Sequence, residues 1–382
     1  MTVIGVDIGG TKIDAGVFAV DRAAGGHPRW TLLDRVTAPT PRTGGPDVLS
    51  GVAGLVDTLR DRHGDCRAVG VGAPGVVDGD GTVRVASAVL PGWAGTPVGR
   101  RLRSRLGVPV VVDNDVRAMA RAEASIGAGR TGRVLHLSVG TGVGGAVSQD
   151  GRVDRGPRGT AGEVAHLTVA ATGPLPCGCD ARDHLESVLA GPALAAAWRS
   201  RTGRPDGDLW AAAAGGVAGG VPDAALVRQV ALEVVAAAGT LAGRALAGLV
   251  CAADLDRIVV AGGVARLGEV LLGPLRDGLA AAAWPRDRRT AVVPAALGDR
   301  AALAGAALLA ASAVPERDGG PDPASRTGGS VDDLAVEIAV GLGTGSDGGG
   351  ADAVAPDPPG TAVETGAART LGARVLHAGT AS

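Results

Sequence analysis

The sequence predicts a mixed α/β protein made of two similar halves. Val3–Val20, "VIGVDIGGTKIDAGVFAV", is typical of two apolar strands joined by a turn of small residues. Val134–Gly151, "VLHLSVGTGVGGAVSQDG", repeats this pattern later in the chain. Helical and strand patterns alternate after each copy, which favours two α/β sheets over one large sheet.

Composition bounds the class of protein. The chain has 382 residues, enough for two domains, and is 46% hydrophobic but only 2% aromatic, so its core is expected to consist of Ala, Val and Leu. The net charge is −2 and no basic patch is evident, which argues against a nucleic-acid partner. We also expect no membrane-spanning segment and no signal peptide, and therefore a cytoplasmic protein.

Further elements are predicted from periodicity and flanking residues. Asp47 is expected to cap a helix near the start of the chain. The expected strands are 30–40, 68–78, 108–115 and 256–264, and the expected helices are 45–64, 98–107, 227–249 and a closing helix at 299–313.

These elements suggest a domain organisation. Residues 1–113, joined by the closing helix, would form an N-terminal lobe, and residues 114–298 a C-terminal lobe. Residues 315–382 are rich in Gly, Pro, Asp and Ser, so we expect a mostly disordered tail with one short helix near Val331–Leu342.

Both hairpin turns have the composition of phosphate-binding loops. Glycines let a backbone approach a phosphate closely, and threonine hydroxyls and a lysine can add donors. Plain hairpin turns are the alternative. The match of Gly140–Gly145 to a dinucleotide fingerprint is rejected, because a strand rather than a helix is expected to follow it. The candidate residues are Asp7 (which could hold Mg²⁺), Gly9, Gly10, Thr11 and Lys12 in the first turn, and Gly140, Thr141 and Gly142 in the second.

A second candidate site lies at the end of the strand predicted over 108–115. Asp113, Asn114 and Asp115 stand where this buried strand ends and a helix begins. Ligands of α/β sheets bind at such strand ends, and phosphoryl transfer to an alcohol needs a carboxylate to accept the hydroxyl proton. Capping of the helix by Asn114 or Asp115 is the alternative explanation.

Several motifs occur in a family-specific order. They are "DIGGTK", "LPGW", "DNDVRAMARAE", "GTGVGG", "GTAGEVAH", "CGCDARDHLE" and "VVAGGVA", followed by "LGDRAALAGAALLA". Over residues 1–313 the chain resembles the ROK family of sugar kinases and sugar-responsive regulators. The resemblance implies two actin-like (ribonuclease H-like) domains with a cleft between them, and a homodimer. It also implies ATP- and Mg²⁺-dependent phosphorylation of a hexose, with glucose as the expected substrate.

The resemblance also implies roles for single residues. Asp115 matches the catalytic base, and Asn114, Glu163, His166 and Glu186 match groups at the sugar. Gly262 and Gly263 match a segment that packs against adenosine. The two glycine turns match the phosphate segments.

Two cysteines and two histidines have the spacing of a metal site. His166, Cys177, Cys179 and His184 fall within a short stretch and suit a closed tetrahedral Zn²⁺ site. The family usually has a third cysteine at position 184 and glycines at positions 180 and 183, where this chain has aspartates. A surface loop with incidental thiols is the alternative, and Cys66 and Cys251 are expected to be ordinary buried residues.

Other departures from the family concern the sugar. The family commonly has an asparagine just before "LPGW", whereas here Val89 and Leu90 precede Pro91. Val116 and Arg117 follow the "ND" pair in place of Ala-Asn, and Ala165 replaces a glycine. An N-acetylglucosamine or N-acetylmannosamine kinase is therefore an alternative. A non-enzymatic sugar-sensing regulator is another, although family regulators carry a helix-turn-helix ahead of the first phosphate turn.

Overall fold

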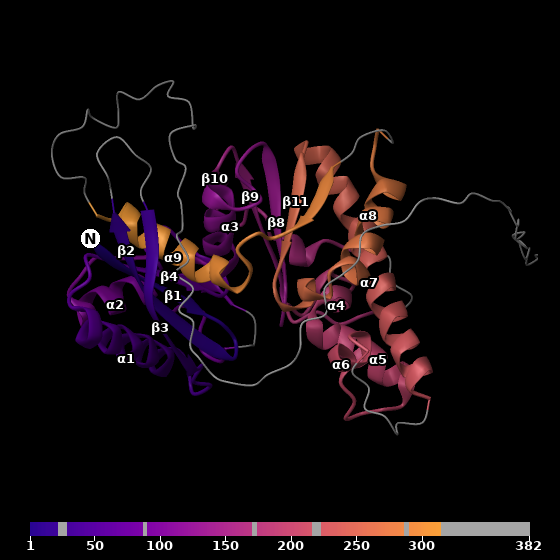
Figure 1. The fold of residues 1–382 in the computed structure, drawn as a ribbon, viewed down its shortest axis with the longest axis horizontal. Coiled ribbons are helices and arrows are strands. Elements are labelled where there is room, and N and C mark those ends of the chain that lie inside the picture. The colour runs from indigo at the N-terminus through magenta and orange to yellow at the C-terminus, as the bar shows by residue number, and fades with distance from the viewer. Residues whose placement is uncertain (22–28, 87–89, 170–173, 216–222, 286–289, 315–382) are drawn as a thin grey trace, which may run out of the picture. The chain divides into compact units, whose positions relative to one another are not determined.

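The computed structural model describes residues 1–21, 29–86, 90–169, 174–215, 223–285 and 290–314. The expected tail, its short helix and Val89 lie outside these residues. The described chain forms two five-stranded mixed sheets (Figure 1). The fold class predicted from the sequence is confirmed.

The first sheet has the strand order β3-β2-β1-β4-β7. β1, β2 and β3 are antiparallel, and β1, β4 and β7 run parallel. A separate two-stranded sheet follows β4. The strands are β1 (Thr2–Ile8), β2 (Lys12–Asp21), β3 (Arg29–Pro39), β4 (Val69–Ala73) and β7 (Val110–Asn114), with β5 (Val76–Val77) and β6 (Val83–Val85) in the small sheet.

The second sheet repeats this topology, with the order β10-β9-β8-β11-β12. Its first three strands are antiparallel, and β8, β11 and β12 are parallel. The repeat predicted from the two glycine-turn hairpins therefore extends to whole sheets. The strands are β8 (Arg133–Val139), β9 (Val143–Gln149), β10 (Arg152–Asp154), β11 (Arg257–Ala261) and β12 (Ala291–Pro294).

Helices cover the sheets and build the apolar cores. α1 and α2 pack on one face of the first sheet, and α9 packs on the other (Figure 1). The helices are α1 (Gly45–His63), α2 (Val98–Leu106), α3 (Asp115–Ile126), α4 (Glu186–Leu189), α5 (Gly191–Thr202), α6 (Leu209–Ala213), α7 (Ala224–Ala253), α8 (Glu269–Ala282) and α9 (Ala301–Ser312), with short 3₁₀ helices η1 (Val164–His166), η2 (Gly263–Leu267) and η3 (Gly298–Arg300).

α9 lies close to its neighbours because a glycine stands at each point of contact. A Cβ on Gly70 of β4 would lie 1.8 Å from the Ala306 carbonyl oxygen. A Cβ on Gly305 would lie 1.6 Å from the Ala118 carbonyl oxygen of α3. No larger residue fits at either position without moving backbone. α9 therefore fixes α3, whose first residue is Asp115, against the first sheet.

Two smaller expectations from the sequence are wrong. Asp47 lies inside the first turn of α1, whose N-cap position is Gly44, so it does not cap the helix. Cys251 is partly exposed, and its thiol donates to the Trp284 carbonyl, whereas Cys66 is buried as expected.

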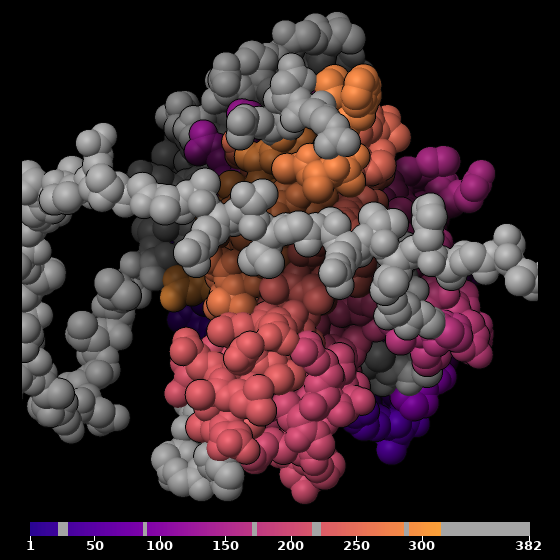
Figure 2. Space-filling model, turned by 90° about the vertical axis from the view of Figure 1, so that its right-hand side faces the viewer, coloured from indigo at the N-terminus to yellow at the C-terminus, as the bar shows by residue number. Residues whose placement is uncertain are grey.

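Within the described residues, α7 is the one helix that is long and apolar enough to span a membrane. Half of its most apolar window is buried against the rest of the protein. Residues of α5, α6 and α7 form the pink and salmon surface at the lower centre of Figure 2.

Candidate functional site

The strand register places the first acidic cluster. Asp7 at the end of β1 is level with Gly72 of β4, which is level with Asp113 of β7. A Cβ on Gly72 would lie 3.5 Å from Asp7 Oδ1 and 3.3 Å from the Asp115 Cα atom. Asp7 and Asp115 therefore both lie next to Gly72 at one edge of the sheet.

Among the described residues, the Asp115 carboxylate is held through its Oδ1 atom. Its Oδ1 atom accepts hydrogen bonds from the Asn114 side-chain amide at 2.8 Å and from the Val116 backbone at 2.9 Å. Desolvation and the nearby Glu163 charge raise the pKa of Asp115 to about 6. The carboxylate is thus fixed through Oδ1 and has the pKa of a base suited to near-neutral pH.

Asn114 caps helix α3. Its Oδ1 accepts from the Arg117 backbone at 3.0 Å, and its Nδ2 donates to the Gly75 carbonyl at 3.1 Å as well as to Asp115. The capping alternative weighed from the sequence is therefore confirmed for Asn114. A contact between Asn114 and sugar stays a prediction.

The pKa of Asp7 is raised further than that of Asp115. Burial, together with the charges of Asp115 and Asp14, raises the pKa of Asp7 to about 7, while Lys12 and Arg35 oppose the rise. Two carboxylates at one strand edge with raised pKa values attract a cation, because a cation would favour their ionised forms. The arrangement fits the Mg²⁺ expected at Asp7.

The first glycine turn is closed by backbone hydrogen bonds. The Gly9 N–H donates to the Lys12 carbonyl at 2.9 Å, and the Thr40 hydroxyl donates to the Gly9 carbonyl at 2.7 Å. Lys12 Nζ is 2.8 Å from Asp14 Oδ2, although the Lys12 side chain is 56% exposed. The turn residues 9–12 thus lie together as predicted, with the lysine paired to its own strand.

The second glycine turn meets two other predicted segments. The Gly140 N–H donates to the Gly142 carbonyl at 2.8 Å, and the Gly140 carbonyl accepts from Gly191 at the start of α5. Gly262, at φ +92°, follows β11, and a Cβ there would lie 2.3 Å from the Val139 carbonyl oxygen. Gly262 and Gly263 therefore lie beside the end of β8, where the second turn with Thr141 begins.

Glu186 connects this turn to the predicted metal loop. Its Oε2 accepts from the Val143 N–H at 3.0 Å, and its Oε1 lies 4.0 Å from Cys177 Sγ. Glu163 precedes η1, and burial raises its pKa, with opposing effects of Arg117 and His166 and a further rise from Glu186. The predicted sugar-contacting acids 163 and 186 are thus close enough to interact electrostatically.

The four predicted metal ligands converge. The donor atoms offered by His166, Cys177, Cys179 and His184 all lie within 4.8 Å of one another. His184 Nδ1 is 3.3 Å from His166 Nδ1 and 3.2 Å from Cys179 Sγ. The two distances from His184 match the separation of about 3–4 Å between ligands that zinc bond lengths of about 2.0–2.3 Å require, and the full set lies close enough to surround one ion after small side-chain movements. The donor set therefore fits Zn²⁺.

The departures at positions 180 and 183 have a backbone explanation. Asp180 has φ +67° and Asp183 has φ +58°, the left-handed region in which glycine is favoured and aspartate is tolerated. Short antiparallel bridges pair Pro176 with Arg182 and Thr168 with His184. The loop thus keeps a tight conformation with aspartates where the family usually has glycines.

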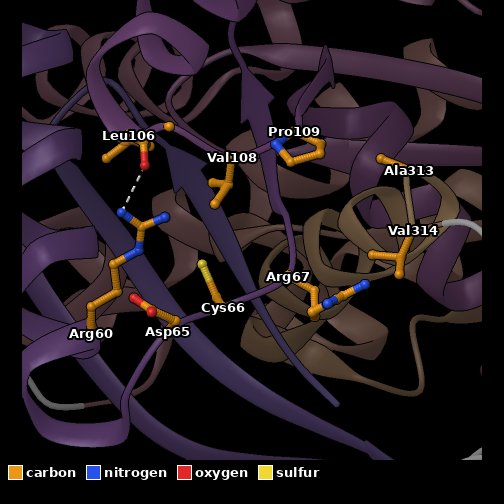
Figure 3. A pocket seen from close by; sticks show the side chains of 10 residues that line it. Arg60, Asp65, Cys66, Arg67, Leu106, Val108, Pro109, Ala313 and Val314 are labelled. Atoms are coloured by element: carbon orange, nitrogen blue, oxygen red, sulfur yellow. Dashed lines mark hydrogen bonds between the residues drawn. The ribbon is translucent and has the colours of Figure 1, made fainter.

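A separate cavity lies at the opposite ends of β4 and β7. It encloses about 510 Å³ between Arg60, Asp65, Cys66 and the start of β7, with Val314 on its far side (Figure 3). Arg60 donates to the Leu106 carbonyl at its edge. None of the residues predicted to form the site lines this cavity.

Comparison with known proteins identifies the family. A sequence model described as "ROK family" matches residues 3–313. The chain belongs to the ROK family. The resemblance inferred from the ordered motifs is confirmed over the same part of the chain.

The chain aligns with sugar kinases along nearly the whole length of each of them. This ROK protein is 34% identical to a glucokinase of Streptomyces coelicolor over 323 residues, covering 80% of this chain and 96% of the relative. It is 29% identical to an N-acetylmannosamine kinase of Citrobacter koseri, covering 81% and 99%. A ROK family glucokinase from Streptomyces griseus, solved in complex with glucose and AMPPNP, is 32% identical, with a TM-score of 0.68 and coverage of 82% and 100%. The chain is an ATP-dependent sugar kinase.

The raised pKa of Asp7 predicts a pH-dependent cost to stability in this ROK protein. The folded-state pKa of about 7 lies above the ordinary aspartate value of 3.8, so the protonated form stabilises the fold fully below about pH 4. That stabilisation is lost as the pH rises through 7. Asp7→Asn should therefore raise the free energy of unfolding at pH 8 by about 2–4 kcal/mol, at 1.36 kcal/mol per pKa unit.

Denaturant unfolding without added divalent cation at pH 4 and pH 8 measures this difference. Asp57→Asn, at a surface ion pair with Arg105, is the matched control and should change little. An Asp7→Asn variant that is no more stable than the wild type at pH 8 would contradict the desolvation argument.

Proposed function

We propose that the protein transfers the γ-phosphoryl group of ATP to the 6-hydroxyl of a hexose, with glucose as the first substrate. The observation that carries the proposal is Asp115, a desolvated carboxylate fixed through one oxygen at the edge where β1, β4 and β7 end. Similarity to a Streptomyces coelicolor glucokinase and to a glucokinase solved with glucose and AMPPNP supports the substrates.

The proposed mechanism begins with Asp115. Its Oδ1 accepts hydrogen bonds from Asn114 and Val116, so Oδ2 is the atom that would accept the proton of the sugar hydroxyl. The hydroxyl oxygen would attack the γ-phosphorus as it loses this proton, and ADP would leave. The pKa of about 6 keeps the group ionised at neutral pH while it remains a competent base. Glu163 and Glu186 would accept hydrogen bonds from other sugar hydroxyls and orient the ring.

The glycine turns would hold the donor. Backbone N–H groups of residues 9–12 and 140–142, together with the Thr11 and Thr141 hydroxyls, are suited to binding phosphate oxygens. Gly262 and Gly263 would leave room for adenosine beside the second turn. Asp7 would hold Mg²⁺, which supplies neutralisation of the charge on the phosphates when bound.

Phosphorylation of an N-acetylhexosamine is a second candidate function. Similarity to the Citrobacter koseri N-acetylmannosamine kinase favours it. Comparison of ATP consumption with glucose, N-acetylglucosamine and N-acetylmannosamine distinguishes the two candidates, because a buried acceptor left unpaired by the wrong sugar costs about 1–3 kcal/mol.

Replacement of Asp115 tests the base. Asp115→Asn should lower kcat by about 10²–10⁴-fold because the amide cannot accept the hydroxyl proton, while hexose binding should persist. In the wild type, kcat/KM for the hexose should fall about tenfold per pH unit below about pH 6. A coupled ADP-release assay and calorimetric sugar titration measure both, with Asp57→Asn as control. Near-normal turnover by the Asp115→Asn variant would refute the assignment.

We also propose that His166, Cys177, Cys179 and His184 bind one structural Zn²⁺. The ion would hold the loop that leads to Glu186, so its loss should weaken sugar binding as well as lower stability. Metal analysis of the purified protein should find about one zinc per chain, reduced severalfold in His184→Ala and in Cys179→Ser. Cys251→Ser is the control and should retain the metal. A wild type free of zinc after growth in zinc-supplemented medium would contradict the proposal.

The chain organisation predicted from the sequence is retained as a proposal. Residues 1–113 with α9 would form one lobe and residues 114–298 the other, with the hinge near Asp113. The protein would act as a cytoplasmic homodimer.

A further inference from the structure

Arg117 is a charged side chain enclosed within the protein. It lies in the first turn of α3, three residues after Asn114, and its side chain is only 1% exposed. Its Nε donates to Asp113 Oδ1 at 2.7 Å, and its Nη1 donates to the Gly159 carbonyl at 2.6 Å. One guanidinium therefore joins the end of β7 to the segment around Gly159, which lies 42 positions after Arg117 in the chain.

The segment that Arg117 holds is rich in glycine and ends at Glu163. Gly156, Gly159 and Gly162 all have positive φ, at +63°, +70° and +90°. Glycine loses more conformational freedom on ordering than other residues do. The backbone of this segment therefore depends on contacts from outside it for a fixed position.

Arg155 supplies a second attachment at the start of the same segment. Its Nη2 donates to the Val77 carbonyl at 3.3 Å and the Asp78 carbonyl at 3.2 Å, and lies 3.6 Å from Asp113 Oδ1. Both arginines thus converge on Asp113, and both connect the segment 155–163 to residues of the N-terminal part of the chain.

We propose that Arg117 is a positioning residue for sugar binding, which fixes the 155–163 segment so that Glu163 faces the sugar bound at Asp115. The proposal rests on the proposed function. Arginine is suited to the task because its planar guanidinium can bond Asp113 and the Gly159 carbonyl at the same time, whereas lysine presents a single point charge.

The positive charge of Arg117 also favours sugar binding, because it stabilises the ionised forms of nearby carboxylates. It opposes the effect of burial on both Glu163 and Asp115, and so lowers the pKa of each carboxyl relative to a site without it. Ionised acceptors bind sugar hydroxyls more strongly than neutral ones do.

Arg117→Lys tests the proposal in a steady-state assay with glucose and ATP. The KM for glucose should rise at least tenfold, while the KM for ATP should change less than twofold, because the glycine turns are untouched. Arg121→Lys is the matched control. Arg121 lies one turn further along α3, and its Nη2 is 3.9 Å from Asp113 Oδ2, which is beyond hydrogen-bonding distance. This variant should leave both KM values within twofold of the wild type.

Two further measurements keep the test decisive. Amide hydrogen exchange over 156–163 should be at least tenfold faster in Arg117→Lys than in Arg121→Lys, whether or not the wild type phosphorylates glucose. If Arg117→Lys does not fold, Arg155→Met replaces it, because that side chain is 38% exposed; it should raise the KM for glucose about three- to tenfold.

Unchanged exchange and an unchanged KM for glucose in the folded variant would overturn the positioning role. A wild type that consumes no ATP with any hexose would instead overturn the proposed function. Hydrogen exchange alone would then decide whether Arg117 fixes the segment.

Discussion

Desolvation of carboxylates at one edge of the first sheet is the constraint on which the candidate site depends. The parallel register of β1, β4 and β7 brings Asp7, Gly72 and Asp113 level, and Asp115 follows at the start of α3. Asp7 and Asp115 lose water on burial, and the loss of water together with nearby negative charge raises their pKa values. This cost falls at the positions of the proposed base and the proposed cation site.

The rest of the structure holds these groups in place by close backbone approach. Gly70 and Gly305 let α9 lie directly on β4 and α3, so the helix that begins at Asp115 cannot shift without moving the core. The same principle operates in the second sheet, where Gly262 lies against the end of β8. Small residues thus set the geometry, and a core of Ala, Val and Leu with few aromatics is consistent with such tight packing.

Features local in sequence were predictable, and long-range contacts were not. The two glycine-turn hairpins and the convergence of His166, Cys177, Cys179 and His184 follow from spacing within short stretches. The bond between Glu186 and the Val143 N–H depends on tertiary packing that no local pattern encodes. Arg117 carried one signal, its departure from the family pattern, but a buried ion pair with Asp113 could not be read from it because arginine is abundant in this chain.

A structure of the Asp115→Asn protein with glucose and a non-hydrolysable ATP analogue tests the central claim most directly. The account predicts a sugar hydroxyl within hydrogen-bonding distance, about 2.6–3.2 Å, of the residue-115 side chain, with the terminal phosphate between residues 9–12 and 140–142. Sugar bound away from position 115, or phosphates bound away from both glycine turns, would contradict it.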